Sequence, residues 1–330
     1  MRQAARVGIL AVSVGLTACS MAPAASPPAS LAAATGVAPT WISSRNPETS
    51  ASLEPDQVIV GGERPATIRL PPGVGDEPAP LLIVLHGYSQ RPAEQQAYFR
   101  LDGYAAEMGA VVAYPEGTRD RDGNRFWNAT DVCCNFYGSD VDDVAYLVSL
   151  VDEIGRATPI DAKRVYLVGH SNGGFMSYRM ACERADVFAA LVSLAGATYD
   201  NDADCEPSER VAILQIHGSA DHTILFDGGT LDFGGTEPRP PYPGARSTVT
   251  SWAAYDGCAA TLATSPETLD IDAWINGPNG PNETTIETAT ECDPGGHAEL
   301  WTIPGGSHAP NLSPTFAKSV IDFLLAHPKP

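Results

Sequence analysis

Residues 165–174 read VYLVGHSNGG, an apolar run that ends in a glycine-rich turn around Ser171. The run has the pattern of a buried strand, and FMSYRM at 175–180 has the pattern of a helix. A strand, a G-x-S-x-G turn and a helix predict a nucleophile elbow, in which glycines allow the sharp turn that raises a serine hydroxyl above a sheet. The alternative is a turn in which Ser171 is only a helix N-cap. The strand and helix on either side favour the nucleophile.

The same alternation of strands and helices fills the rest of the chain. Strands are predicted at 81–85, 110–114, 164–168, 188–194, 211–216 and 299–303, and helices at 93–107, 172–182 and 313–326. A capping box at Ser139 and Asp142 predicts one more helix. Residues 227–245, rich in Gly and Pro, are expected to form a long loop. This order predicts an α/β fold with a mostly parallel sheet and helices on both faces.

If Ser171 is a nucleophile, one of the seven histidines must act as its base. In such folds the catalytic residues follow in the order Ser, Asp or Glu, and His, with the His on a loop after the last strand. His308 fits this place. Asp221 ends the turn after the strand at 211–216, and we expect it to orient the His308 ring. Asp227 is the runner-up for the acid.

Two backbone N–H groups are expected to bind the oxyanion, those of Asn172 and Tyr88. The aromatic side chains of Tyr88, Trp127 and Phe226 are candidates for substrate contact, and ordinary packing is the alternative for each. His86 is expected to make structural hydrogen bonds beneath the Tyr88 loop. The spacing of Cys and His predicts no metal site, and the reaction needs no cofactor.

Composition limits the partners of the chain. The 330 residues are 43% hydrophobic and carry a formal charge of −20. A surface this acidic repels phosphate backbones and anionic lipids, so nucleic acid is not an expected partner. No apolar run reaches the roughly 20 residues that a membrane helix needs. We therefore expect membrane contact only through a lipid anchor, and we expect a monomer.

The N-terminus has the features of an export signal. Arg2 and Arg6 precede an apolar stretch at 7–16, and residues 1–18 are predicted to be a signal peptide of the lipoprotein type. LTAC at 16–19 looks like a lipobox, which would make Cys19 the lipidated first residue of the mature chain. Ordinary cleavage near Ala22 is the alternative. The expected protein is exported, either as an outer-membrane or cell-surface lipoprotein or as a secreted protein.

Composition also divides the exported chain. Residues 19–52, rich in Ala, Pro and Ser, are expected to be a tether, and residues 53–330 the catalytic domain. Of seven cysteines, six remain once Cys19 carries lipid, and export favours disulfides between them. Sequence alone leaves fifteen connectivities for six cysteines. We expect the adjacent Cys133 and Cys134 to bond different partners, because a disulfide between neighbours strains the peptide link.

Several short motifs together resemble one family, the secreted polyhydroxybutyrate depolymerase-like esterases, which are akin to bacterial feruloyl and acetylxylan esterases. They include LHGY at 85–88, YPEGT at 114–118, WNA at 127–129, GHSNGG at 169–174 and HGSAD at 217–221. The resemblance implies an α/β-hydrolase fold and the disulfides Cys258–Cys292 and Cys182–Cys205. Family members often carry a Trp soon after the catalytic His, whereas here His308 precedes APNL. This departure is expected to alter the acyl or polymer subsite.

These features predict an exported serine esterase that acts through Ser171, His308, Asp221 and an acyl-enzyme. Its expected substrate is a polyester, either a polyhydroxyalkanoate or an aromatic polyester, or a related ester. Feruloylated or acetylated plant polysaccharide is the alternative. A peptidase on the same fold usually carries an extra domain that this length lacks. A non-enzymatic surface lipoprotein that uses the fold for binding is the rival of another class, and the presence of all three triad residues argues against it.

Overall fold

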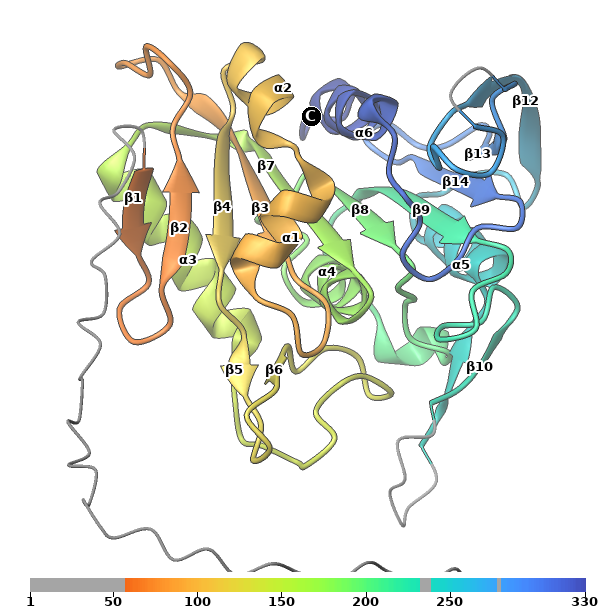
Figure 1. The fold of residues 1–330 in the computed structure, drawn as a ribbon, viewed down its shortest axis with the longest axis horizontal. Coiled ribbons are helices and arrows are strands. Elements are labelled where there is room, and N and C mark those ends of the chain that lie inside the picture. Colours follow the sequence, from red (N-terminus) through yellow and green to blue (C-terminus); the bar gives the residue numbers. More distant parts are fainter. Residues whose placement is uncertain (1–56, 232–238, 278–279) are drawn as a thin grey trace, which may run out of the picture. The chain divides into compact units, whose positions relative to one another are not determined.

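Ten strands form one sheet in the part of the chain that the computed structural model describes, residues 57–231, 239–277 and 280–330 (Figure 1). Their order across the sheet is β1-β2-β4-β3-β7-β8-β9-β14-β13-β12. The described residues fall within one unit, Ser52–Pro330. The expected signal peptide at 1–18, the lipidation site at Cys19, the tether at 19–52 and the domain start at Leu53 lie outside the described residues.

The six central strands pair in parallel, in the order β4-β3-β7-β8-β9-β14. They are β3 (Ala79–Leu85), β4 (Val111–Pro115), β7 (Ile160–His170), β8 (Ala190–Leu194), β9 (Ala212–Gly218) and β14 (Ala298–Ile303). Each of the six overlaps a strand predicted from an apolar run, because side chains buried on both faces make such runs. The α/β-hydrolase fold with a mostly parallel sheet is confirmed.

Antiparallel strands complete both edges of the sheet. They are β1 (Gln57–Val60) and β2 (Ala66–Arg69) at one edge, and β13 (Thr284–Ala289) and β12 (Leu262–Leu269) at the other. The pairs β5 (Thr118–Arg119) with β6 (Arg125–Phe126) and β10 (Gly228–Thr230) with β11 (Pro241–Pro243) lie outside this sheet. The second of these pairs occupies part of the stretch that was expected to be only a loop.

Helices cover both faces of the sheet, as Figure 1 shows. One hydrophobic cluster joins the sheet to α3 (Asp143–Ala157), α4 (Asn172–Glu183) and α5 (Ala245–Tyr255). A second cluster joins the opposite face to α1 (Pro92–Phe99), α2 (Asp102–Glu107) and α6 (Pro314–Ala326). A 3₁₀ turn spans Asp202–Asp204. None of the helices within the described ranges is both long and apolar enough to cross a bilayer.

Two helix predictions need correction. The helix expected at 93–107 is two helices, because Arg100 adopts a left-handed conformation with φ 51° and its side chain donates to the carbonyl of Leu312. Asp142 caps helix α3 without a second residue: its carboxylate accepts the N–H of Ala145 at 2.8 Å. Ser139 takes no part in this cap: its N–H donates instead to the Asn135 side chain.

The structure contains the two disulfides that the family resemblance implied, Cys182–Cys205 and Cys258–Cys292. It also bonds Cys133 to Cys134, so the expectation that these neighbours bond different partners was wrong. The other four cysteines in the described part of the chain pair with one another elsewhere, which leaves Cys133 and Cys134 only each other. Both are buried, in the segment between β6 and α3.

Candidate active site

Ser171 lies in the turn between β7 and α4, with φ 53° and ψ −119°. Such a conformation is strained for a residue with a side chain and is typical of a nucleophile elbow. Two glycines make the turn feasible. A Cβ on Gly169 would lie 2.1 Å from the Gly173 carbonyl oxygen, and a Cβ on Gly173 would lie 2.2 Å from that of Leu85. The Ser171 side chain makes no capping hydrogen bond to α4, which argues against the N-cap alternative.

His308 and Asp221 are brought together beyond the carboxyl ends of two neighbouring strands. Strands β9 and β14 are parallel neighbours, and each residue lies on the loop that follows one of them. The Nδ1 of His308 lies 2.8 Å from Oδ2 of Asp221. With Nδ1–H donating to a carboxylate, Nε2 is the basic nitrogen of the neutral ring. Asp227, the runner-up for the acid, lies exposed six residues further along the chain.

The carboxylate of Asp221 is buried, and both of its oxygens have hydrogen-bond partners. Its Oδ1 accepts the backbone N–H groups of Thr223 at 2.8 Å and Ile224 at 2.9 Å. Burial alone would raise the pKa of Asp221, but hydrogen bonds from His217 and His308 outweigh it and hold the pKa below its ordinary value. Asp221 is therefore ionised at neutral pH, as an acid that orients a histidine must be.

Ser171 and His308 line the same cavity, whose volume is about 280 Å³. Cys133, Cys134, Ile224 and Leu231 contribute apolar surface to it, and Gly87, Tyr88, Gln90, His170, Thr223 and Ala309 also line it. The volume is near the lower end for small-molecule sites. A cavity of this size and lining suits a modest, largely apolar substituent on either side of an ester.

The loop after β3 is held from below by His86. This side chain is buried: its Nε2 accepts the N–H of Gly117 at 3.0 Å, and its Nδ1 donates to the carbonyl of Gly87 at 2.8 Å. Burial lowers the pKa of His86 to about 4, so the ring is neutral near neutral pH. The structural role expected for His86 is confirmed. The hydrogen bonds fix the loop that carries Tyr88, whose hydroxyl donates to Asp120 at 2.5 Å.

Asn172 begins α4 directly after Ser171, where the first N–H groups of a helix lack intrahelical acceptors. Its side chain is buried and ties the elbow to the next loop. The Oδ1 accepts the backbone N–H of Trp127 at 2.7 Å, and the Nδ2 donates to the Trp127 carbonyl at 3.0 Å. Both oxyanion candidates thus belong to well-anchored segments, and Tyr88 also lines the cavity.

Two of the three aromatic candidates do not contact the cavity. Trp127 is fully buried, and its indole N–H donates to the His86 carbonyl at 3.0 Å, so it packs beneath the site. Phe226 is half-buried and packs edge-on against the His217 ring, with centroids 5.8 Å apart. Neither residue lines the cavity. The expectation of substrate contact needs correction for the fully buried Trp127, and for Phe226 it stays a prediction. Tyr88 alone of the three lines it.

Sequence reasoning missed His170, which directly precedes the nucleophile. It is buried, and its Nε2 donates to the backbone carbonyl of His308 at 3.0 Å. Burial lowers the pKa of His170 to about 4, which keeps the ring neutral. The side chain therefore joins the elbow to the loop that carries His308. Its place inside G-x-S-x-G was the available signal, but a motif does not say where its variable side chains point.

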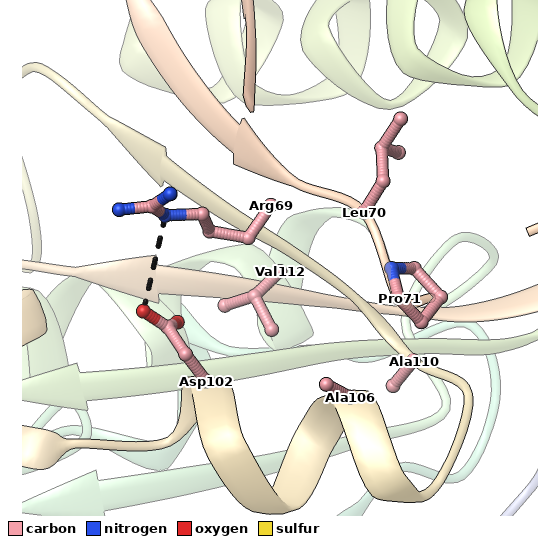
Figure 2. Close-up of a pocket in the computed structure, with 7 residues that line it drawn as sticks. All are labelled: Arg69, Leu70, Pro71, Asp102, Ala106, Ala110 and Val112. Atoms are coloured by element: carbon pink, nitrogen blue, oxygen red, sulfur yellow. Dashed lines mark ion pairs between the residues drawn. The ribbon is translucent and has the colours of Figure 1, made fainter. Parts of the chain in front are cut away.

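A second pocket, of about 220 Å³, lies between β2, β4 and α2 and shares no lining residue with the first (Figure 2). It is lined by Arg69, Leu70, Pro71, Asp102, Ala106, Ala110 and Val112. Arg69 faces Asp102 at 4.0 Å, and Asp102 also accepts the Tyr114 hydroxyl at 2.5 Å. None of its lining residues is a serine, cysteine or histidine, so this pocket lacks the nucleophile and base that the first one has.

Comparison with known proteins finds matches to esterases. Residues 65–229, half of the chain, match the family described as esterase PHB depolymerase. NocK of Nocardia uniformis subsp. tsuyamanensis, named as an esterase, is 30% identical over 91% of this chain and 87% of its own length. Feruloyl esterase B of Piromyces equi is 29% identical over 74% of this chain, which spans 42% of that protein.

A solved structure shows the same fold. The acetyl xylan esterase from Aspergillus awamori superposes with a TM-score of 0.56 at 17% identity, over 81% of this chain and 98% of that one. At this identity the likeness concerns the fold and not the substrate. It agrees with the central parallel sheet and the helices on its two faces.

Proposed function

The chain belongs to the PHB depolymerase family of esterases, and from that premise we propose that it hydrolyses esters through a Ser171–His308–Asp221 triad. Family membership makes it a carboxylic-ester hydrolase. The observation that carries the triad is the 2.8 Å contact between His308 Nδ1 and Asp221 Oδ2, with His308 at the cavity that Ser171 also lines.

The proposed reaction has two halves. The Ser171 oxygen attacks the ester carbonyl carbon while His308 Nε2 takes its proton, and the N–H groups of Asn172 and Tyr88 bind the oxyanion. The tetrahedral intermediate then expels the alcohol oxygen, which receives that proton from His308. Water then attacks the acyl-enzyme while His308 Nε2 takes a proton from it. The second tetrahedral intermediate breaks its bond to the Ser171 oxygen, which regains that proton from His308, and the carboxylic acid leaves. Asp221 stays ionised and stabilises the imidazolium in both halves.

We propose polyester as the substrate, because an exposed indole lies on a loop that is hydrogen-bonded to the segment after His308. Among the large hydrophobic side chains of the described residues, Trp274 has the highest exposed fraction, 76%, and Ile275 beside it is 36% exposed. The N–H of Ala273 donates at 2.9 Å to the carbonyl of Asn311, three residues after His308. Exposed apolar side chains of this kind suit adsorption to a neutral, water-insoluble polymer.

Esters on plant polysaccharide are the second candidate. The names of the relatives favour it, since they include feruloyl esterases and an acetylxylan esterase. An exposed indole also suits stacking on sugar rings, so Trp274 does not separate the two candidates. Activity on films of polyhydroxybutyrate and of an aromatic polyester, compared with activity on methyl ferulate and acetylated xylan, ranks them.

We further propose that the protein is exported and acts as a monomer, held to a membrane only by lipid on Cys19 if that residue is modified. The three disulfides support an oxidising compartment. Membrane fractionation of cells that express the full chain or Cys19→Ser tests the anchor. Equal membrane association of both proteins would contradict it, and light scattering on the released form gives the oligomeric state.

The triad is tested with p-nitrophenyl esters from acetate to octanoate. We expect Ser171→Ala to abolish activity and Asp221→Asn to lower kcat by about 10⁴-fold, because the neutral side chain favours the wrong histidine tautomer. Asp227→Asn is the matched control and should behave as the wild type. Loss in Asp227→Asn with activity kept in Asp221→Asn would move the acid to the runner-up. Activity kept in Ser171→Ala would contradict the triad as a whole.

A further inference from the structure

His217 lies on β9, four residues before Asp221, and it has no part in the proposed reaction described so far. Its side chain is 1% exposed, and its Nε2 lies 2.8 Å from the carbonyl oxygen of Ile224 and 3.4 Å from Oδ2 of Asp221. The second distance joins it to the same carboxylate oxygen that binds His308. Asp221 is thus placed between two imidazole rings.

The tautomer of His217 depends on its neighbour Gln215, whose side-chain amide has a fixed orientation. The Gln215 Nε2 lies 2.8 Å from the Gly196 carbonyl, which can only accept, so this end of the amide is the nitrogen. Its Oε1 accepts the hydroxyl hydrogen of the buried Tyr178 at 2.9 Å. The second amide hydrogen of Gln215 points to His217 Nδ1 at 3.0 Å.

Because Nδ1 of His217 accepts a hydrogen bond, the ring hydrogen must be on Nε2. That hydrogen faces two acceptors, the Ile224 carbonyl and the Asp221 carboxylate. The backbone N–H of Ile224 in turn donates to Oδ1 of the same carboxylate at 2.9 Å. His217 therefore holds both the carboxylate and the turn that binds its other oxygen.

We propose that His217 is a positioning residue of the triad: its Nε2–H, fixed by the buried Tyr178–Gln215 chain, holds the Asp221 carboxylate in the orientation that binds His308. The inference rests on the proposed triad. The ring transfers no proton, because Gln215 occupies its only other nitrogen with a donor. The His217 ring orients the Asp221 carboxylate, and its hydrogen bond stabilises the ionised form of that carboxylate.

The main test compares His217→Leu with His217→Gln on a soluble p-nitrophenyl ester. Leucine fills the space without a donor, whereas the glutamine amide nitrogen is as many bonds from Cα as the imidazole Nε2 and can donate in its place. We expect His217→Leu to lower kcat about tenfold or more with KM unchanged. Loss of the hydrogen-bond partner that orients a metal-ligating side chain has an effect of this size. His217→Gln should recover most of the loss. Unchanged kcat in His217→Leu overturns the inference.

A spectroscopic measurement separates positioning from a general loss of structure. The low-field proton resonance of the hydrogen bond between His308 and Asp221 should shift in His217→Leu and return in His217→Gln. Leu214→Ala, on the same strand but in the opposite hydrophobic cluster, is the destabilised control, and its resonance and kcat should match the wild type. An equal loss of kcat in this control would also overturn the inference.

His217→Phe carries the test if His217→Leu does not fold. It keeps an aromatic ring in the place of the imidazole and removes the donor that faces Asp221. We expect kcat to fall as in His217→Leu, and an unchanged kcat again overturns the inference. Ser171→Ala and Asp221→Asn run alongside. Activity kept in either would refute the triad, whereas their inactivity beside a wild-type kcat in His217→Leu removes only the role of His217.

Discussion

The backbone of Ser171 adopts φ 53°, a region that costs on the order of 1–3 kcal/mol for a residue with a side chain. The fold tolerates this cost because neighbouring backbone packs closely against the turn. Behind it, Gly173 approaches the end of β3 so closely that no side chain fits there. The position of the nucleophile therefore depends on glycines that never touch substrate.

Gly173→Ala tests this dependence. The added Cβ would lie 2.2 Å from the Leu85 carbonyl oxygen, so either the elbow or the strand must shift. We expect the variant to lose a large part of its esterase activity, together with a few degrees of Tm. Gly155→Ala is the matched control, since Gly155 is an exposed helical glycine with open space around it. That change should raise the unfolding free energy by about 0.5–1 kcal/mol at unchanged activity.

At the scale of single residues, the proposed triad was predictable because it depends only on order along the chain. The nucleophile, base and acid each come directly after a strand, and parallel neighbouring strands bring their loops together. The aromatic residues were less predictable, since burial of a ring depends on contacts distant in sequence. Trp127 comes after a short exposed hairpin yet packs on His86, and Phe226 comes after the acid loop yet packs on His217. Nothing local distinguishes either residue from Tyr88.

Among the elements, the central strands were predictable and the edges were not. A strand such as β3 is buried along its whole length and reads as a continuous apolar run. By contrast, β12 reads LATSPETL, which is mostly exposed and has no alternation of apolar and polar residues. It forms a strand because it pairs with β13. The break at Arg100 depends on a contact with Leu312, more than two hundred residues away.

The C-terminal end of α5 provides a pH-dependent prediction. Asp256 caps this helix, is buried, and accepts the N–H of His297 at 3.0 Å through its carboxylate. Burial raises the pKa of Asp256 to about 7. The folded chain then holds a proton that the unfolded chain lacks between about pH 4 and pH 7. This group therefore stabilises the fold at low pH and loses that effect as the pH rises to 7.

Asp256→Asn removes the titration and keeps an acceptor for His297. We expect the unfolding free energy of the variant, minus that of the wild type, to increase by on the order of 2 kcal/mol between pH 5 and pH 7 and to level off above it. Urea unfolding at several pH values measures the difference. Asp293→Asn, which removes an exposed acid near the same helix end, is measured alongside as the control. A flat difference for Asp256→Asn would show that its carboxyl ionises normally.

For the whole molecule, the question is how a small cavity would accommodate the proposed polymer. The cavity of about 280 Å³ can hold only the group next to the scissile ester, so the rest of a polymer must lie across the surface. A formal charge of −20 makes that surface unsuitable for anionic partners. A neutral polymer can still bind through exposed apolar groups, and the loop with Trp274 is hydrogen-bonded to the segment after His308.

Buried carboxylates hold residues 271–274 of this loop. The N–H groups of Ile271 and Asp272 donate to Glu283 at 2.9 and 2.8 Å, and the N–H of Trp274 donates to Asp272 at 3.0 Å. An exposed indole held on such a frame keeps its position when it meets a surface, so little conformational entropy is lost on adsorption. The proposed polymer substrate thus makes a prediction about Trp274 that a soluble ester does not test.

Trp274→Ala should leave kcat/KM for p-nitrophenyl butyrate unchanged, while less enzyme adsorbs to a polyester film and less acid is released from it. Adsorption isotherms and film mass loss measure the two effects. Met108→Ala, which truncates an exposed apolar side chain at the end of α2, is the control and should behave as the wild type in both assays. Film activity that is unchanged in Trp274→Ala would contradict this role of the indole. If release from acetylated or feruloylated xylan falls instead, the polymer is polysaccharide, and the second candidate replaces the first.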